Sequence, residues 1–387
     1  MAQQKIESES RLSFMEATSI IVGHGVGSGI LSVPYLASRN SWLDIIWVIA
    51  LCYAINLLMH YMIADLSLNN GGAQFIKCFE NELFKGKSGK ALTWAAFVFL
   101  GLSVLVNVSG FISGSAAVFS SWIGVSPRIG MVIYYVLASL VMLFGMKIVG
   151  ICENISVYAM VAVVGALLVA VLAGGTSEMP NRSVAPGNIL ALYSMVAFAL
   201  SAVMSTPQVV KGLNGDVRKI RASIALGTGI NTGLILLITI TTLLGAGSEI
   251  TQNGALVDLA SKLGGWVGTV GYIFSLLALS TSFWANTLNL RDIVHEQTGL
   301  GLKPSYLACS IPSLLLAIIG LQSFVGFTRI ASVIQVLTGV GIIISFHRSR
   351  KRTGESLIVN KFASVPFEVL VIASSLIATV GALVKVR

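Results

Sequence analysis

Long apolar stretches alternate with short polar ones over nearly the whole chain. About eleven of these stretches are apolar enough and long enough to cross a bilayer, because a spanning helix needs about 20 residues. They cover residues 14–38, 42–66, 91–118, 129–145, 155–174, 189–210, 222–244, 266–290, 306–321, 330–346 and 362–384. The pattern predicts an all-α polytopic membrane protein with a polar amino-terminal tail, residues 1–13.

The apolar stretches also correspond between the two halves of the chain. A shift of about 176 residues carries the starts of the third, fourth and fifth stretches onto the eighth, ninth and tenth. Inverted repeats of this kind are typical of secondary transporters. We therefore expect a first five-helix repeat in residues 14–174, a second and inverted one in 189–346, and one further helix within 347–387.

Composition supports the membrane assignment. The chain is 55% hydrophobic and 11% charged, whereas soluble domains carry about 25% charged residues. The net charge of +9 needs no nucleic-acid partner, because cytoplasmic loops of membrane proteins are rich in Lys and Arg. The four cysteines have no CxxC spacing, so we expect unpaired thiols. They are Cys52, Cys78, Cys152 and Cys309.

The distribution of basic residues predicts the orientation. With the amino terminus in the cytoplasm and eleven spans, 18 of the 25 Lys and Arg residues fall on the cytoplasmic side, as the positive-inside rule requires. The tail 1–13 and the basic loop at the start of 347–387 are then cytoplasmic. A cell inner or plasma membrane is the expected location.

The first apolar stretch contains GHGVGSG at residues 23–29. Each Gly costs about 1 kcal/mol relative to Ala inside a helix, and a broken backbone is tolerated in a membrane only where it lines a cavity or contacts protein. We therefore expect a broken helix here. The sixth stretch carries small polar residues and Pro207, which predicts a second break at residues 199–205.

The first break offers two kinds of backbone group. Free amide groups of Ser28, Gly29 and Ile30 suit a carboxylate, and free carbonyl groups near Gly23 and Val26 suit a cation or an ammonium group. A zwitterion satisfies both, which indicates an amino acid substrate. The alternative is a glycine face used only for close helix packing.

Charged residues are absent from the middle of the apolar stretches, which disfavours a proton relay built on acids. The acidic residues of these stretches are placed at or near their ends: Glu16, Asp44, Asp65, Glu153, Asp292 and Glu368. His24 and His60 are the remaining titratable candidates; a packing hydrogen bond is expected for His60, and the role of His24 stays open. In the eighth stretch, the hydroxyl run 280–282 offers oxygen ligands to a hard cation such as sodium, or bonds back to its own helix.

Three segments resemble a known family. GVGSGILSVPYLA (25–37), GDVRKIRASIALGTGIN (215–231) and ALSTSFWANTLNLRDIV (278–294) resemble the amino acid/auxin permease family of the amino acid–polyamine–organocation superfamily, in particular its bacterial hydroxy and aromatic amino acid permeases. The resemblance implies a leucine-transporter-type fold of five plus five inverted helices, here with one extra helix.

The resemblance also implies two sets of site residues. A sodium ion would be held by carbonyl groups of the first break and by the eighth stretch, at Gly23, Val26, Ala278, Thr281 and Ser282. Proton-coupled relatives use a Lys of the fifth helix instead, and the expected span 155–174 has none. The substrate would be held by Gly25, Gly27, Ser28, Gly29, Asn107, Phe111, Ala199, Ser201, Ala202 and Ser205. For Asn107, an interhelical bond is the alternative.

These features predict a secondary active transporter of neutral amino acids, aromatic or hydroxy ones included, that works by alternating access with sodium. The expected partners are the amino acid and the lipid bilayer, with no nucleic acid, no cofactor besides the coupling ion, and no enzymatic activity. A proton-coupled permease using His24 as its proton site is the first alternative. A non-transporting membrane sensor or channel is the second.

Overall fold

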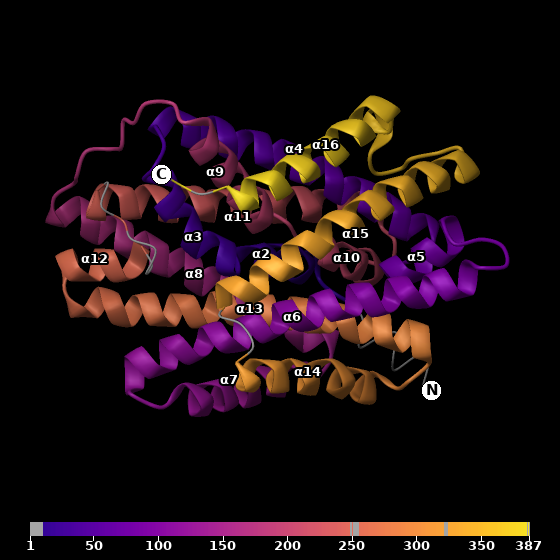
Figure 1. The fold of residues 1–387 in the computed structure, drawn as a ribbon, viewed down its shortest axis with the longest axis horizontal. Helices are drawn as coiled ribbons and strands as arrows, with labels where there is room; N and C mark the ends of the chain where they lie inside the picture. Colours follow the sequence, from indigo (N-terminus) through magenta and orange to yellow (C-terminus); the bar gives the residue numbers. More distant parts are fainter. Residues whose placement is uncertain (1–10, 248–249, 251–254, 321–323, 385, 387) are drawn as a thin grey trace.

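The computed structural model describes residues 11–247, 250, 255–320, 324–384 and 386. Within these residues every regular element is a helix (Figure 1). The elements are α2 (Phe14–Val26), α3 (Ser28–Ala37), α4 (Trp42–Asn69), α5 (Phe75–Glu82), α6 (Gly89–Ile123), α7 (Pro127–Met142), α8 (Met146–Gly174), α9 (Pro186–Ala199), η1 (Val203–Ser205), α10 (Thr206–Gly212), α11 (Val217–Ala246), α12 (Ala255–Leu263), α13 (Gly265–Thr298), α14 (Leu302–Ile319), α15 (Phe324–Thr353), η2 (Asn360–Phe362) and α16 (Val365–Leu383).

Each predicted apolar stretch coincides with a helix or a helix pair. Over the described residues, eight helices are long and apolar enough to span a membrane, with α9 and α10 counted as one. The pair α2 and α3, the shorter apolar helix α7 and the helix α15 account for the other stretches. The prediction of an all-α polytopic membrane protein is confirmed.

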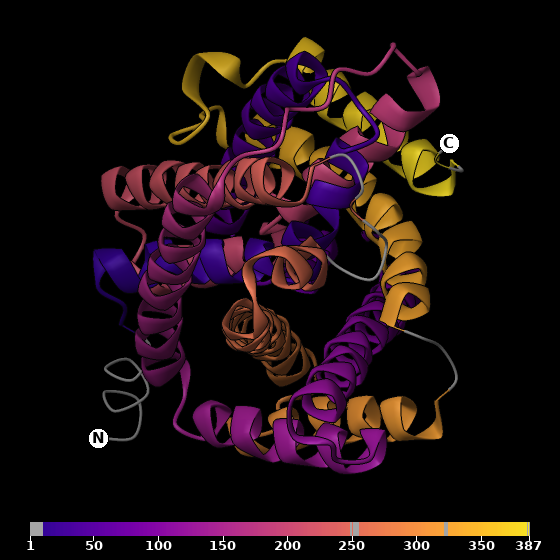
Figure 2. The same ribbon diagram turned by 90° about the vertical axis from the view of Figure 1, so that its left-hand side faces the viewer.

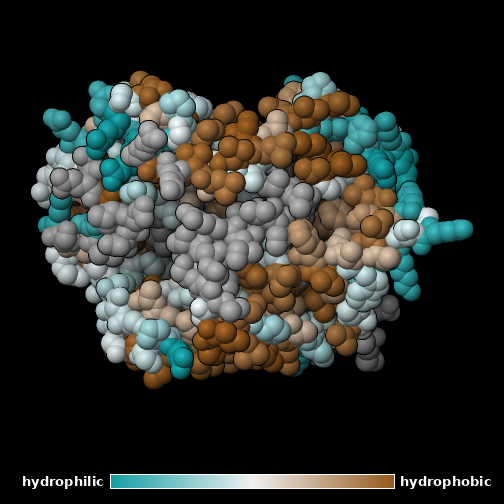
Figure 3. Space-filling view, in the orientation of Figure 1, coloured by the Kyte–Doolittle hydropathy of each residue, from teal (hydrophilic) through white to brown (hydrophobic). Residues whose placement is uncertain are grey.

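The surface of the molecule agrees with a membrane setting. Figure 3 shows apolar residues gathered between two more polar ends, along the direction in which the helices run. Large apolar side chains point outward from the long helices, among them Leu43 on α4, Val98 on α6 and Val169 on α8, which are 57%, 62% and 67% exposed. Monomeric soluble proteins rarely expose contiguous apolar patches of this kind.

Helix α13 lies inside the bundle. It packs against α2, α6, α8 and α14, and Figure 2, which looks along the bundle, shows it as the orange-brown helix near the centre. Its middle section is buried from Ala278 to Ile293 with only Ser280 partly exposed. The hydroxyl run of the eighth apolar stretch therefore lies in the interior and not at the lipid surface.

Both predicted helix breaks are confirmed. Helix α2 ends at Val26 and α3 begins at Ser28, with Gly27 between them at φ −39° and ψ −138°, outside the helical region. Helix α9 ends at Ala199, and α10 begins at Thr206 after a short 3₁₀ turn.

The start of the fifth long helix differs from the prediction. Helix α8 begins at Met146, so it includes Lys147, Glu153 and Asn154, all of which precede the predicted span 155–174. These polar residues lower the local hydropathy and hide the helix start from a search for apolar stretches. The difference matters because it brings a carboxylate into the membrane helix.

Candidate functional site

The two helix breaks face each other across a short distance. A Cβ placed on Gly29 would lie 2.5 Å from Cβ and 2.7 Å from Cα of Ala199, and a Cβ placed on Gly25 would lie 2.8 Å from the carbonyl oxygen of Ala199. Any side chain at these two positions would collide with the second break. The glycines therefore allow the two interrupted helices to touch.

Side chains from two other helices hold the second break open. The backbone N–H of Ala202 donates to Nε2 of His60 on α4 at 2.9 Å, and Nδ2 of Asn231 on α11 donates to the carbonyl of Ala199, also at 2.9 Å. Each bond satisfies a backbone group that a continuous helix would satisfy itself. His60 makes the packing bond expected for it, whereas Asn231 was missed because nothing in its local sequence marks it.

His24 connects the two breaks. Its Nδ1 lies 2.8 Å from Oγ of Ser205, so the last turn of α2 meets the 3₁₀ turn that leads into α10. The backbone around it is also in contact with α13, because Oγ of Ser282 donates to the carbonyl groups of Gly23 and His24 at 3.2 and 3.4 Å.

A small cavity lies between the first break, α6, α9 and α13. Its volume is about 20 Å³, room for one or two water molecules at about 10–15 Å³ each. It is lined by His24, Gly25, Gly27, Asn107, Phe111, Phe198, Ser201, Ser282 and Asn286. Asn107 also bonds across to α13, since its Nδ2 donates to Oδ1 of Asn286 at 3.2 Å.

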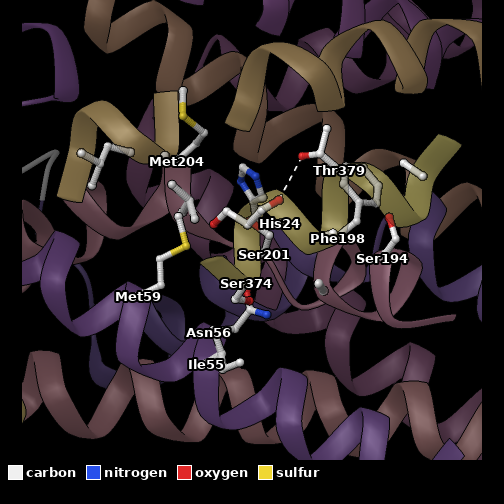
Figure 4. Close-up of a pocket in the computed structure, with 17 residues that line it drawn as sticks. His24, Ile55, Asn56, Met59, Ser194, Phe198, Ser201, Met204, Ser374 and Thr379 are labelled. Carbon is white, nitrogen blue, oxygen red and sulfur yellow. Dashed lines mark hydrogen bonds between the residues drawn. The ribbon is translucent and has the colours of Figure 1, made fainter. Parts of the chain in front are cut away.

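A larger cavity of about 120 Å³ adjoins the small one and shares His24, Phe198 and Ser201 with it. It extends between α4, α9, α15 and α16. Figure 4 shows His24 and Ser201 near its middle, with Met59 and Met204 to one side. This space could not be predicted from the sequence, because its walls come from helices far apart in the chain.

The structure places the predicted substrate residues in different settings. Gly25, Gly27, Asn107, Phe111 and Ser201 line the small cavity. In contrast, Gly29 and Ala199 pack against each other. The side chain of Ser28 lies outside the described part of the structure. The remaining two lie in the second break, where Ala202 bonds to His60 and Ser205 to His24.

Four of the predicted sodium residues, Gly23, Ala278, Thr281 and Ser282, come together where α2 and α13 touch. Ser282 reaches the Gly23 carbonyl, and Oγ1 of Thr281 donates to the carbonyl of Ala278 at 3.0 Å. Val26 is buried and is the last residue of α2. The Thr281 bond is the return to its own helix that the sequence left open, yet both oxygens of that bond belong to the predicted ligand set.

Glu153 corrects the expectation that carboxylates stay at the ends of the spans. Its side chain is fully buried on α8, and a Cβ placed on Gly23 would lie 1.5 Å from its Oε2 and 3.0 Å from Cβ of Thr281. Neither carboxylate oxygen has a hydrogen-bond partner among the described residues. The sequence missed it because the predicted span began two residues later.

The absence of Lys from the fifth helix also needs correction. Helix α8 contains Lys147, but its Nζ lies 2.6 Å from Oε2 of Glu16 on α2. Lys147 is six residues before Glu153, about 9 Å along the helix at 1.5 Å per residue. The one lysine of α8 thus forms an ion pair with Glu16 and does not interact with the predicted sodium residues.

Among the described residues, no group of three or more His, Cys, Asp or Glu side chains could hold a metal ion together. The ligands that the site does offer are carbonyl and hydroxyl oxygens with a single carboxylate. Such a set of oxygen ligands fits a hard cation better than zinc or copper, which favour imidazole or thiolate ligands.

Comparisons with known proteins agree on the class of protein. The sequence profile of the tryptophan/tyrosine permease family matches residues 10–300, whereas no curated protein matches the chain. Among solved structures, the chain is similar to MhsT in complex with L-phenylalanine, with a TM-score of 0.70, 16% identity, and 96% of this chain and 98% of that chain covered.

Two further solved structures share the fold. One is Mhp1, a nucleobase-cation-symport-1 family transporter, in a closed conformation with bromovinylhydantoin bound, at a TM-score of 0.66 and 12% identity over 97% of this chain and 91% of that one. The other is a mutant of the manganese transporter of Eremococcus coleocola, with a TM-score of 0.64, 11% identity, and 96% of this chain and 85% of that chain covered. At such identities the likeness shows the fold alone, which is the leucine-transporter-type fold.

Proposed function

Because the chain belongs to the tryptophan/tyrosine permease family and has the leucine-transporter-type fold, we propose that it is a sodium-coupled transporter of neutral amino acids. It works by alternating access, and the cell inner or plasma membrane is its proposed location. Aromatic amino acids are the first substrates to test, since the matched family is named for tryptophan and tyrosine. Membership of the wider amino acid/auxin permease family stays a prediction.

The pair of opposed helix breaks carries this proposal. At the first break, the carbonyl end of α2 and the amide end of α3 lie on either side of Gly27, next to a cavity. A helix amino terminus favours a carboxylate, and a helix carboxyl terminus favours a cation. An amino acid backbone carries both charges a few ångströms apart, so a single break can hold both.

The two cavities differ in what they can accept. The small cavity, at about 20 Å³, is too small for an amino acid, so substrate binding requires the two breaks to separate. The adjoining cavity of about 120 Å³ is lined in part by apolar side chains, those of Ile55, Met59, Phe198, Met204 and Ile342. We assign the substrate backbone to the small cavity and the aromatic side chain to the larger one.

The contacts between α2 and α13 support sodium as the coupling ion. Ser282 bridges the two helices through the carbonyl groups of Gly23 and His24. The affinity of an ion bound there would therefore depend on the relative position of the helices. An ion that binds one arrangement better than another shifts the equilibrium toward it. This is the property that coupling requires.

Uptake into proteoliposomes at varied sodium concentrations tests this assignment, and the half-saturating sodium concentration is the measured quantity. Thr281→Ala and Ser282→Ala each remove one ligand oxygen, so each should raise that concentration about 10-fold, the effect of about 1.4 kcal/mol. Ser275→Ala is the matched control, because Ser275 lies on the same helix and, among the described residues, its hydroxyl bonds only to its own Gly271 carbonyl. Unchanged sodium dependence in both site variants would refute the ligand assignment.

The proton-coupled alternative predicts a different pattern. Uptake would then follow a pH gradient without sodium, and His24→Gln would abolish it. The His24–Ser205 bond joins the two breaks in either case. For this reason, loss of transport in His24→Gln supports proton coupling only when sodium has no effect on the wild-type protein.

A further inference from the structure

Asn56 of α4 presents a hydrogen-bond acceptor to the larger cavity. Its side chain lines that cavity, and the residue is only 7% exposed. Its Nδ2 donates to the carbonyl of Cys52, one turn earlier on the same helix, at 3.0 Å, whereas no described residue donates to its Oδ1. Because buried polar groups are normally paired, this oxygen indicates a donor that water or a ligand supplies.

The direction of the amide follows from its bond to the helix. A backbone carbonyl can only accept a hydrogen bond, so the amide atom that faces the carbonyl of Cys52 is the nitrogen. The oxygen of Asn56 is therefore the atom left for the cavity. The same bond holds the side chain in place, so the acceptor is offered in a fixed direction.

The hydroxyl groups of the same cavity place no such demand on a ligand, because a hydroxyl can either donate or accept. Two of them are also bonded within the protein. Thr379 donates to the carbonyl of Ser375 on its own helix, and Ser374 is paired with the hydroxyl of Tyr193. The amide oxygen of Asn56 can only accept, so a ligand that reaches it must bring a donor.

Asn56 lies one helical turn away from the residue that holds the second break. His60 of α4 accepts from the N–H of Ala202, and Asn56 precedes His60 by four residues. Both therefore lie on the same face of α4, about 6 Å apart along the helix. Figure 4 shows Asn56 toward one end of the drawn side chains, beyond Ser201, which borders both cavities. A ring that enters from the small cavity would have its far end at Asn56.

The size and the walls of the larger cavity suit an aromatic ring. Its volume is about 120 Å³, and an apolar protein cavity of about 150 Å³ holds benzene. Apolar side chains such as those of Ile55, Met59 and Phe198 form much of its wall. Ligand pockets are typically apolar, with a few polar groups that provide specificity, and Asn56 has the position of such a group.

We propose that Asn56 selects the substrate, because its Oδ1 accepts a hydrogen bond from the far end of the substrate's ring. The phenol hydroxyl of tyrosine and the indole N–H of tryptophan both supply this donor. The inference rests on the proposed amino acid transport and on the ring lying in the larger cavity, and it does not depend on the coupling ion. Phenylalanine lacks the donor and would leave the oxygen unpaired, which is how a site built for a polar group rejects an apolar analogue.

The test is the affinity of the purified protein for tyrosine and phenylalanine, which differ by one hydroxyl group, measured by equilibrium binding in one buffer. The wild-type protein should bind tyrosine about 10-fold more tightly than phenylalanine, or more, as expected for one buried hydrogen bond. Asn56→Leu should lose most of this ratio, because tyrosine binds it more weakly and phenylalanine at least as tightly. A variant that only harmed the fold would weaken both ligands equally.

Thr379→Val is the matched control. Thr379 lines the same cavity, but its hydroxyl donates to its own helix, so the ratio of the two affinities should stay close to that of the wild type. A second measurement needs no variant and stands if Asn56→Leu does not fold. In the wild-type protein, 4-aminophenylalanine, which keeps a donor, should bind about as tightly as tyrosine, and 4-fluorophenylalanine, which has none, about as weakly as phenylalanine.

A second ligand pair distinguishes the two sources of the donor. Tryptophan is compared with 3-(benzothiophen-3-yl)alanine, in which a sulfur atom replaces the indole N–H in a ring system of similar shape. If Asn56 pairs with the indole, Asn56→Leu should lose the preference for tryptophan. A loss confined to the tyrosine pair would assign the bond to the phenol hydroxyl. Either loss supports the selection of substrates by Asn56.

The remaining outcomes separate this inference from the proposed function. If the wild type discriminates within neither pair, or if Asn56→Leu preserves both ratios, Asn56 does not select the substrate, although amino acid transport stands. If Thr379→Val changes the ratios as much as Asn56→Leu does, the inference is also wrong. If the wild-type protein binds none of tyrosine, tryptophan and phenylalanine, the proposed transport of aromatic amino acids fails first.

Discussion

At the scale of single residues, each glycine of the first break allows a different neighbouring residue to come close. Gly29 allows α3 to touch Ala199, Gly25 leaves room for the side chain of Asn231, and Gly27 leaves room for Ser282. A Cβ at these positions would lie 2.5, 2.0 and 2.2 Å from atoms of those residues. Their role is thus close approach between helices, which a conformational argument about helix breaking does not reveal.

Gly29→Ala is the substitution that tests this role. The added methyl group meets backbone and side-chain atoms of Ala199, and overpacking of this kind costs about 1–3 kcal/mol. We expect a lower Tm and a loss of most uptake. Gly165→Ala is the control, because a Cβ at Gly165 on α8 meets nothing within 4 Å; a similar loss in both variants would contradict the account.

The role of a single residue can be predicted from the sequence only when a pattern in the neighbouring residues marks it. The glycine run and the hydroxyl run 280–282 are local patterns, and the structure brings both to the junction of α2 and α13. Glu153 and Asn231 act through contacts with residues 130 and 32 positions away. Nothing near them in the chain marks these contacts, so only the folded arrangement identifies them.

At the scale of helices, the second break depends on neighbours as much as on its own sequence. Helix α9 ends at Ala199, where Asn231 of α11 takes the free carbonyl and His60 of α4 takes the free N–H of Ala202. Pro207 follows in the first turn of α10, where the missing N–H of proline does no harm. The sequence predicted the break from its small polar residues and Pro207, but not the two side chains that hold it.

Asn231→Ala should weaken the second break. It leaves the carbonyl of Ala199 buried without its donor, at a cost of about 1–3 kcal/mol, and the effect should appear as a lower Tm in detergent and lower substrate affinity. Thr232→Ala is the control from the next position of α11, since in the described part of the chain the Thr232 hydroxyl bonds only to the carbonyl of Thr228 in its own helix. Equal effects of the two changes would show that Asn231 has no special role.

At the scale of the whole molecule, the hydropathy pattern was sufficient to predict the number and order of the long helices. It works because lipid requires each span to satisfy its own backbone, so length and apolarity alone define a span. It failed at the start of α8, where Lys147 is bound to Glu16, Asn154 accepts a hydrogen bond from Ser19, and Glu153 is enclosed beside Gly23. The cavities could not be predicted, because they arise from how the helices pack.

The orientation of the molecule is a prediction at this scale. An odd number of spans with a cytoplasmic amino terminus places the carboxyl terminus on the opposite side, as the bias of Lys and Arg requires. Reporter fusions after Thr353 and after Arg387 should therefore report opposite sides of the membrane. The same side for both fusions would mean that α16 does not cross.

The most direct test of the central claim is the accumulation of radiolabelled tryptophan or tyrosine by proteoliposomes that contain the wild-type protein. The account predicts uptake above equilibrium with an inward sodium gradient, and none when choline replaces sodium. Accumulation that persists without sodium and follows an inward proton gradient would contradict sodium coupling.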